Sequence, residues 1–436
     1  MHDAFEASNA PNLYAPLPAG VGVPGTNVGA RIAGAACATL SFLYPSQRPQ
    51  FEAAVAGANM APLDAGISAQ FGRAIAQNLI DKLARPADFY ASDKGYVGTP
   101  GPGRHRTDPT DPNQGYHGPR YGVQARRFAV TKQHTLAAPP SQGSAGYLSV
   151  LQEVRAKGAK PGTIGLTRTP NETLVGLYWA YDGPKNIGTP PRLYNQIARQ
   201  LADQFALTEG QCARLFALVN AAMGDAGIYA WREKYRHDVW RPVLGIREHA
   251  ASMGPLANPG NVLNANCDPF WLPLGAPKTN SDAPPFTPPF PAYPSGHATF
   301  GAASMQMMRL YLKEIGKMDL ADTHTSDTIQ FSLVSDELNG VSTDTGVVRP
   351  RHERQFESLW QAIFENGVSR VFLGVHWSFD AFATADTKVN GAYKPANTIT
   401  YNLIQGQQIG GVPLGLSIAD DIYNSGLKIA NVLLVG

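Results

Sequence analysis

The chain has 436 residues, 43% of them hydrophobic and 16% charged, which is typical of a folded globular protein. Its 36 Lys and Arg residues are balanced by 34 Asp and Glu residues, and the net charge of +2 argues against a nucleic-acid partner. The longest apolar run, residues 32–44, is shorter than the roughly 20 residues that cross a bilayer, so we expect no membrane span.

The N-terminal sequence MHDAFEASNA lacks the basic stretch and the apolar segment of a signal peptide. We therefore expect a soluble protein, and secretion stays open because the sequence could lack its true N-terminus. The three cysteines, Cys37, Cys212 and Cys267, are far apart and odd in number, so neither a disulfide framework nor a thiolate metal site is expected.

Helical periodicity dominates wherever the chain is poor in Gly and Pro. Residues 190–205 begin with two prolines and carry large apolar side chains at every fourth position, which predicts a helix with one buried face. Thr208 and Gln211 have the spacing of a capping box that opens a second helix, through Tyr235.

Two more helices are expected over residues 295–315 and 354–373, and strand signals are few. The sequence therefore predicts an all-α fold of bundled helices. Two long Gly- and Pro-rich segments, 92–122 and 253–293, interrupt the helices. Loops of this length are usually functional or disordered, and the second is the better candidate because its aromatic residues lead into the motif PSGH.

Three short segments carry residues suited to chemistry: KYRHDVWRP, AYPSGHATFG and SRVFLGVHWSFD. In the first, Lys234 and Arg241 are seven positions apart on an expected helix, which places the two cations on one face. In the third, Gly374 is expected to let the backbone turn between Arg370 and His376.

Together these segments predict a site for a tetrahedral oxyanion. They supply three cations, a hydroxyl group and backbone N–H groups at a helix start, from Lys234, Arg241, Arg370, Ser295, Gly296 and His297. Guanidinium groups match two oxygens each, and a helix N-terminus adds oriented donors. His297 stands beside the anion for proton transfer, and His376 is left to bond the central atom. Asp380 could orient the His376 ring.

The same residues carry a resemblance. K-x6-RP, then PSGH, then SR-x5-H-x3-D is the pattern of the superfamily that includes acid phosphatases, lipid phosphate phosphatases and vanadium-dependent haloperoxidases. Longer stretches resemble the fungal-type vanadium chloroperoxidases: YWAYDG, DELNGV, PFTPPFPAYPSGHATFG and FENGVSRVFLGVHWSFDA. The similarity runs from about residue 178 to the C-terminus, and the first third of the chain resembles that family only loosely.

The resemblance implies a vanadate cofactor, with no haem or flavin. It implies that ionic and hydrogen bonds come from Lys234, Arg241, Ser295, Gly296 and Arg370. It also implies that His376 is the single protein ligand to vanadium, that His297 is the acid–base catalyst, and that Lys234 polarises a bound peroxide oxygen. The expected partners are hydrogen peroxide, a halide and a small organic acceptor.

Two aromatic residues match positions that line the halide side in the chloroperoxidases. They are Trp231 and Phe290, and the alternative for both is plain core packing. In bromide-preferring relatives the place of Phe290 is typically a histidine, so phenylalanine favours chloride. Asp182 resembles the acid that pairs with Arg370, although it could equally be a helix-end acid.

Two other functions use the same residues. In an acid phosphatase, or another vanadium-independent homologue, His376 would be the nucleophile and His297 the acid for the leaving group. A non-catalytic oxyanion-binding protein is the third hypothesis. We expect one mainly helical domain over 1–436, with an N-terminal bundle over 1–210 and a C-terminal bundle over 211–436 that carries the site. The sequence does not indicate the oligomeric state.

The remaining histidines show no ligand spacing, and most are expected at the surface. They are His105, His117, His134, His237, His249, His324 and His352.

Overall fold

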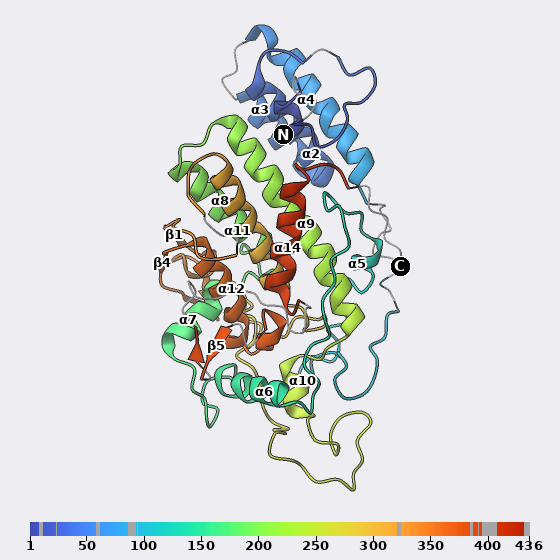
Figure 1. Ribbon diagram of the computed structural model, residues 1–436, viewed down its shortest axis with the longest axis vertical. Coiled ribbons are helices and arrows are strands. Elements are labelled where there is room, and N and C mark those ends of the chain that lie inside the picture. The colour runs from blue at the N-terminus through green and yellow to red at the C-terminus, as the bar shows by residue number, and fades with distance from the viewer. Residues whose placement is uncertain are drawn as a thin grey trace.

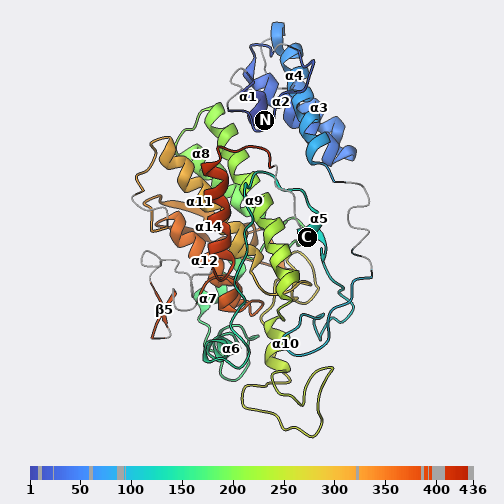
Figure 2. The same ribbon diagram turned by 45° about the vertical axis from the view of Figure 1, so that its right-hand side comes forward.

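The computed structural model describes residues 1–430 except 8–11, 23, 58–61, 86–92, 94, 321–323, 384–386, 391 and 395–407. Helices form most of the regular structure, as expected, and Figures 1 and 2 show them bundled along the long axis of the molecule. The longer helices are α2 Val28–Leu43, α3 Arg48–Gly57, α4 Pro62–Leu83, α6 Ala145–Lys157, α7 Pro170–Tyr178, α8 Pro190–Gln204, α9 Glu209–His237, α11 Gly296–Glu314, α12 Leu359–Phe372 and α14 Gly411–Asn424. The shorter helical elements are α1 His2–Phe5, η2 Pro45–Gln47, α5 Tyr121–Gln124, α10 Pro242–Arg247, η4 Asp336–Leu338 and η5 Ser378–Asp380.

Strands in the described residues form only small antiparallel ribbons of two strands each. The pairs are β1 Phe331–Val334 with β4 Glu353–Phe356, β2 Thr343–Asp344 with β3 Val347–Val348, and β5 Lys388–Val389 with β6 Ala392–Tyr393. In the first ribbon, Phe331 is opposite Phe356 and Val334 is opposite Glu353.

Helix α9 runs through the middle of the molecule, with α11 and α14 beside it in both views (Figures 1 and 2). Helix α11 also packs against α8 and α12, and most of its length is buried. Gly415 of α14 allows close contact with α11, because a Cβ atom there would lie 2.4 Å from the carbonyl oxygen of Thr299 in α11. Helix α11, which begins within the PSGH segment, is thus packed against both α9 and α14.

The predicted starts of α8 and α9 are confirmed. Helix α8 begins with two prolines and buries its apolar face. At α9, the Thr208 hydroxyl accepts a hydrogen bond from the Gln211 N–H, and the Gln211 side chain accepts one from the Thr208 N–H. The backbone N–H groups of Thr208 and Gln211 at the start of the helix both gain an acceptor, as a capping box requires.

Two predictions about helix extent are wrong. The helix expected over 354–373 begins only at Leu359, because Ser358 caps it through the Gln361 N–H and the residues before it form strand β4. Lys234 and Arg241 do not share a helix, because Asp238 adopts a left-handed conformation (φ 53°, ψ 39°) that ends α9. Arg241 instead precedes α10 in extended conformation, as a residue before proline prefers.

The segment between α10 and α11 is irregular, as expected, and lies with α6 and α10 at the lower end of Figure 1. Helices α2 and α4 lie at the opposite end, where two glycines allow close contact. A Cβ atom at Gly34 would lie 2.1 Å from the Ala69 carbonyl oxygen, and one at Gly72 would lie 1.9 Å from that of Arg31.

The division of the chain near residue 210 stays a prediction. Helix α8, which precedes that point, packs against α9 and α11, which follow it. None of the helices in the described part of the chain is long and apolar enough to cross a membrane.

Candidate active site

The structure brings the three predicted segments together at one end of α9, α11 and α12. Lys234 lies in the last turn of α9, and Arg370 lies in the last turn of α12. Ser295 is the N-cap of α11, so Gly296 and His297 open that helix. A cavity of about 430 Å³ is lined by seven of the predicted residues, Asp182, Trp231, Phe290, Gly296, His297, Arg370 and His376.

Lys234 is fully buried and is held by backbone oxygens. Its Nζ atom donates to the carbonyl oxygens of Pro291 at 2.8 Å, Ala292 at 3.1 Å and Pro294 at 2.5 Å. Burial, followed by the positive charge of Arg241, holds the pKa of Lys234 well below its usual value. The cage of carbonyls therefore fixes the position of the ammonium group but brings no negative charge to balance it.

Arg241 also lies against the aromatic ring of Phe290. Its Nε atom donates to the Phe290 carbonyl oxygen at 2.8 Å, and its Nη1 atom donates to the Val375 carbonyl oxygen at 2.8 Å. Its Nη2 atom is buried and has no hydrogen-bond partner among the described residues. Burial lowers the pKa of Arg241 to about 9, which reflects the cost of a guanidinium bonded only to neutral groups.

Arg370 has a carboxylate partner. Its Nη1 and Nη2 atoms bond the two carboxylate oxygens of Asp182 at 2.9 and 2.8 Å, a bidentate pair between residues 188 positions apart. The side chains are 0% and 6% exposed. The Arg370 Nε atom is buried and lacks a partner in the described chain. The structure thus confirms that Asp182 pairs with Arg370 and is not a solvated helix-end acid.

His376 is oriented by Asp380, as the sequence spacing predicted. Its Nδ1 atom lies 2.8 Å from Asp380 Oδ2, so Nδ1 carries the proton. Its Nε2 atom lies 2.9 Å from Arg241 Nη1 and therefore presents a lone pair. Gly374 has a φ of +71°, and a Cβ atom there would lie 2.3 Å from the Gly158 carbonyl oxygen, so only glycine fits this turn.

His297 is buried at the start of α11. Its Nε2 atom lies 2.5 Å from the Ala180 carbonyl oxygen, so Nε2 carries the proton and Nδ1 is the basic nitrogen. Burial, followed by the positive charge of Arg370, lowers the pKa of His297 to about 3. When no oxyanion is bound in the cavity, a pKa this low keeps the imidazole neutral at ordinary pH.

Trp231 and Phe290 form an aromatic wall on the cation side of the cavity. Their ring centroids are 4.8 Å apart, and Lys234 Nζ lies 5.0 Å from the Phe290 ring centroid. The guanidinium carbon of Arg241 lies 4.9 Å from the same centroid. One ring therefore lies against two cations, an attraction that uses the negative face of the ring.

Sequence reasoning missed part of the wall. His117 and Phe300 also line the cavity, as do two pairs of adjacent prolines. The His117 carbonyl oxygen accepts hydrogen bonds from Trp231 Nε1 at 3.2 Å and from Tyr235 at 2.8 Å. No motif near His117 indicated this position, because it depends on how the segment that contains α5 packs against α9.

Five of the seven other histidines keep some contact with solvent, as expected for most of them: His117 is exposed, and His237, His249, His324 and His352 are partly exposed. His105 and His134 are buried and depart from that expectation. His134 is held by Asp421, at 3.0 Å from Nε2 to Oδ2. Both ring nitrogens of His105 lack a partner among the described residues. A lone histidine gives no signal for such burial.

The residues present fit a tetrahedral oxyanion. Two guanidinium nitrogens, Arg241 Nη2 and Arg370 Nε, are buried without partners in the described chain and can donate to it. Gly296 leaves open the space where a Cβ atom would come within 3.5 Å of the Trp231 ring. Excess positive charge, spare donors and a helix N-terminus are the features that bind such an anion.

Comparisons with known proteins agree with this site. A family model for the second helical-bundle domain of VCPO matches residues 214–388, which include Trp231 and all three site segments. The vanadium chloroperoxidase of Curvularia inaequalis is 39% identical over 430 residues, covering 83% of this chain and 68% of that protein.

Solved structures share the fold. A bacterial vanadium-dependent iodoperoxidase matches with a TM-score of 0.62 and 18% identity, over 97% of this chain and 88% of that one. A holo-type bacterial vanadium-dependent chloroperoxidase matches with a TM-score of 0.60 and 16% identity, over 98% and 89%. Together with the extent of the identity to the Curvularia enzyme, the family model and the site place the chain in a known family: it belongs to the vanadium chloroperoxidases.

Proposed function

We propose that the chain binds vanadate in the cavity described above and uses hydrogen peroxide to oxidise chloride or bromide. Membership of the family makes it a vanadium-dependent haloperoxidase, and the residue roles and the preferred halide are our proposal. The observation that carries the proposal is the set of buried, partly unpartnered cations around one lone-pair nitrogen, His376 Nε2.

Vanadate, when bound, supplies a Lewis acid that activates peroxide for attack by a halide. Arg241 and Arg370 hold the anion with the donors that the protein leaves free. The helix start at Ser295 and Gly296 adds a hydroxyl group and a backbone N–H. His376 is the protein ligand, because Asp380 keeps its proton on Nδ1 and its lone pair on Nε2.

His297 moves protons. Its Nδ1 atom is unprotonated and can accept a proton from incoming hydrogen peroxide, while the Ala180 carbonyl keeps the other nitrogen protonated. A bound oxyanion offsets the field of Arg370, which raises the proton affinity of His297 when the site is loaded.

Lys234 and the aromatic wall define the halide side. The ammonium group of Lys234 lies 5.0 Å from the Phe290 ring centroid and can attract an anion to this part of the cavity. Because Trp231 and Phe290 exclude water, a halide there loses hydration and is bound mainly by the cations. We infer that chloride is a substrate and that the oxidised halogen then reacts with a small organic acceptor.

The test is peroxide-dependent chlorination of a simple β-diketone by phosphate-free apoprotein, titrated with orthovanadate at mildly acidic pH. We expect a saturable rise in rate that inorganic phosphate reverses by competition for the same pocket. If the rate does not respond to vanadate, and the protein instead cleaves a phosphomonoester without added metal, the function is that of an acid phosphatase.

Phe290→His tests the halide assignment. The polar ring admits water to the wall, so we expect the ratio of chloride to bromide turnover to fall severalfold while vanadate affinity changes little. The matched control is Phe300→Leu. Phe300 lines the same cavity, but the rings that lie against Lys234 are those of Trp231 and Phe290. An unchanged halide ratio in Phe290→His would remove Phe290 from the halide site.

A further inference from the structure

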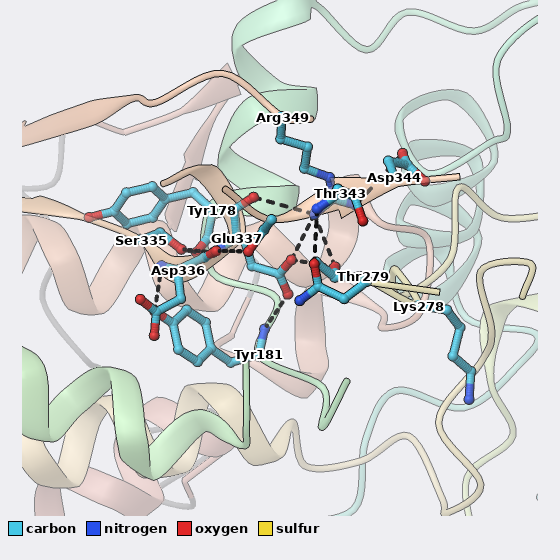
Figure 3. Close-up of polar contacts among 12 residues, drawn as sticks. Tyr178, Tyr181, Lys278, Thr279, Ser335, Asp336, Glu337, Thr343, Asp344 and Arg349 are labelled. Atoms are coloured by element: carbon cyan, nitrogen blue, oxygen red, sulfur yellow. Dashed lines mark hydrogen bonds and ion pairs between the residues drawn. The ribbon is translucent and has the colours of Figure 1, made fainter. Parts of the chain in front are cut away.

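A buried carboxylate, Glu337, bonds the chain next to Asp182, and its contacts are drawn in Figure 3. Glu337, in η4, is 0% exposed, and its Oε2 atom accepts hydrogen bonds from Arg349 Nη1 at 2.7 Å and from Thr279 Oγ1 at 2.5 Å. Its Oε1 atom accepts from the backbone N–H of Tyr181 at 3.2 Å. Both oxygens are therefore used, one by an ion pair and one by the chain next to Asp182.

The same short segment holds that stretch of chain at two more points. The Ser335 hydroxyl donates to the Tyr178 carbonyl oxygen at 2.7 Å. The Asp336 N–H donates to the Tyr181 hydroxyl at 2.8 Å. Three consecutive residues thus hold one turn, and these contacts are drawn as dashed lines in Figure 3.

The turn needs support because Tyr181 has a φ of +41°, which is uncommon for a residue other than glycine. It also serves both sides of the site. The Ala180 carbonyl fixes the proton of His297, and the Asp182 carboxylate holds Arg370. A shift of this single turn would misplace two groups that line the cavity.

We propose that Glu337, with Arg349 as its counter-ion, is a positioning residue that fixes the turn Ala180–Asp182 and, through it, His297 and Arg370. Glu337 does not line the cavity, so it acts only through these neighbours. The catalytic roles of His297 and Arg370 rest on the proposed function. The contacts that hold the turn are independent of it.

Burial raises the pKa of Glu337 to about 7, and the hydrogen bond from Thr279 and the charge of Arg349 oppose that rise. The acceptor role of the carboxylate therefore depends on those two donors. Thr279 belongs to the segment between α10 and α11, and Arg349 follows β3, so the turn is tied to two further parts of the chain.

The first test variant is Glu337→Gln, which has nearly the same shape. The amide has one acceptor oxygen, while Tyr181 and Arg349 both present N–H donors, so one of the two loses its hydrogen bond to this side chain. We expect the dissociation constant of the apoprotein for inorganic phosphate to rise about tenfold, the effect of roughly one lost buried hydrogen bond on the site. We also expect kcat for chlorination to fall with little change in the KM for chloride.

Asp327→Asn is the matched control. Asp327 is an equally buried carboxylate, with an ion pair to Arg309 Nε at 2.9 Å and hydrogen bonds from the backbone N–H groups of Leu359 and Trp360. It does not contact the turn. We expect it to lower Tm as Glu337→Gln does but to leave phosphate affinity and kcat unchanged.

A crystal structure of Glu337→Gln supplies a readout that needs no activity. We expect the Arg370–Asp182 distances to lengthen beyond 3.5 Å, the limit of a hydrogen bond. If the wild type does not chlorinate but the variant still weakens phosphate binding tenfold, the proposed function fails and the positioning role stands. Wild-type phosphate affinity and wild-type Arg370–Asp182 distances in the variant would overturn the inference.

Thr279→Val is a milder variant in case Glu337→Gln folds poorly. It keeps the shape and the ion pair but removes the hydrogen bond to Oε2 and the one that Thr279 Oγ1 accepts from Arg349 Nη1. We expect a two- to threefold rise in the dissociation constant for phosphate. A Thr279→Val protein with reduced Tm and unchanged phosphate affinity would mean that the cluster only stabilises the fold.

Discussion

The two sides of the proposed active site hold their buried positive charge in different ways. On one side, Arg370 is neutralised by Asp182, whose own turn is held by Glu337. On the other side, Lys234 and Arg241 are bonded to backbone carbonyls and packed against Phe290, and no carboxylate bonds them among the described residues. On the first side a carboxylate already balances the positive charge, whereas the second carries charge that an anion must balance.

The largest effect is expected at the nitrogen where the two sides meet. His376→Ala removes the lone pair that faces Arg241, so peroxidase turnover should be abolished while the fold stays intact. Steady-state chlorination and circular dichroism of the same preparation check this. Undiminished chlorination by the variant would remove the central residue of our proposal.

Asp182→Ala tests whether Asp182 balances the charge on the Arg370 side. The substitution leaves a guanidinium that is 0% exposed without its partner, so the free energy of unfolding of the apoprotein should fall by about 3 kcal/mol. Urea unfolding with and without phosphate measures this. Phosphate should restore part of the loss, because it brings a negative charge to Arg370. A stability equal to that of the wild type would mean that the pair is solvated.

The Lys234 side should show the reverse dependence. In the wild type, phosphate at a hundred times its dissociation constant should stabilise the protein by about 2.7 kcal/mol. Lys234→Met should lose most of this anion-linked stabilisation, because it removes the cation that the carbonyl cage holds in place. Thermal unfolding across a phosphate series decides it. An equal shift in variant and wild type would assign anion binding to Arg241 and Arg370 without Lys234.

A pH-dependent effect is expected at His105, a buried ring on which the positive charge behind the second side acts. Burial, then the charges of Arg241 and Lys234, lowers its pKa well below the usual value. The neutral form is thus favoured in the folded state, and stability that is fully present above about pH 6.5 is lost as pH falls, because the unfolded chain binds the proton first.

His105→Leu removes this proton. The fall in unfolding free energy between pH 6 and pH 4 should become shallower by roughly 1.4 kcal/mol per pH unit. His249→Leu, at a less buried ring whose pKa is lowered by burial alone, is the control and should change the slope less. Parallel curves for wild type and His105→Leu would mean that His105 is charged in the folded protein.

Local patterns predicted the parts of the site that neighbouring residues determine. The start of α11 followed from Ser295 and Gly296, and the pair His376–Asp380 followed from a spacing of four. The helix expected to carry both Lys234 and Arg241 was wrong, because the backbone of Asp238 decides where α9 ends. Even so, both cations reach the same aromatic ring.

Contacts between distant segments carried no local signal. The pair of Arg370 with Asp182 was suggested only by a resemblance, because nothing in a single sequence links residues 188 positions apart. Glu337 lies in the stretch DELNGV, which resembled the family but suggested no role. His117 and the burial of His105 likewise depend on tertiary packing, which no periodicity records.

The separation of the site residues along the chain also orders events during synthesis. Lys234 meets Pro294 across 60 positions, Arg241 meets His376 across 135, and Arg370 meets Asp182 across 188. A nascent chain that ends before His376 cannot contain the pocket, however well its earlier helices have formed. Long-range closures of this kind are slow steps. Vanadate can therefore bind only after most of the chain has been made, and it cannot serve as a template on which the early helices assemble.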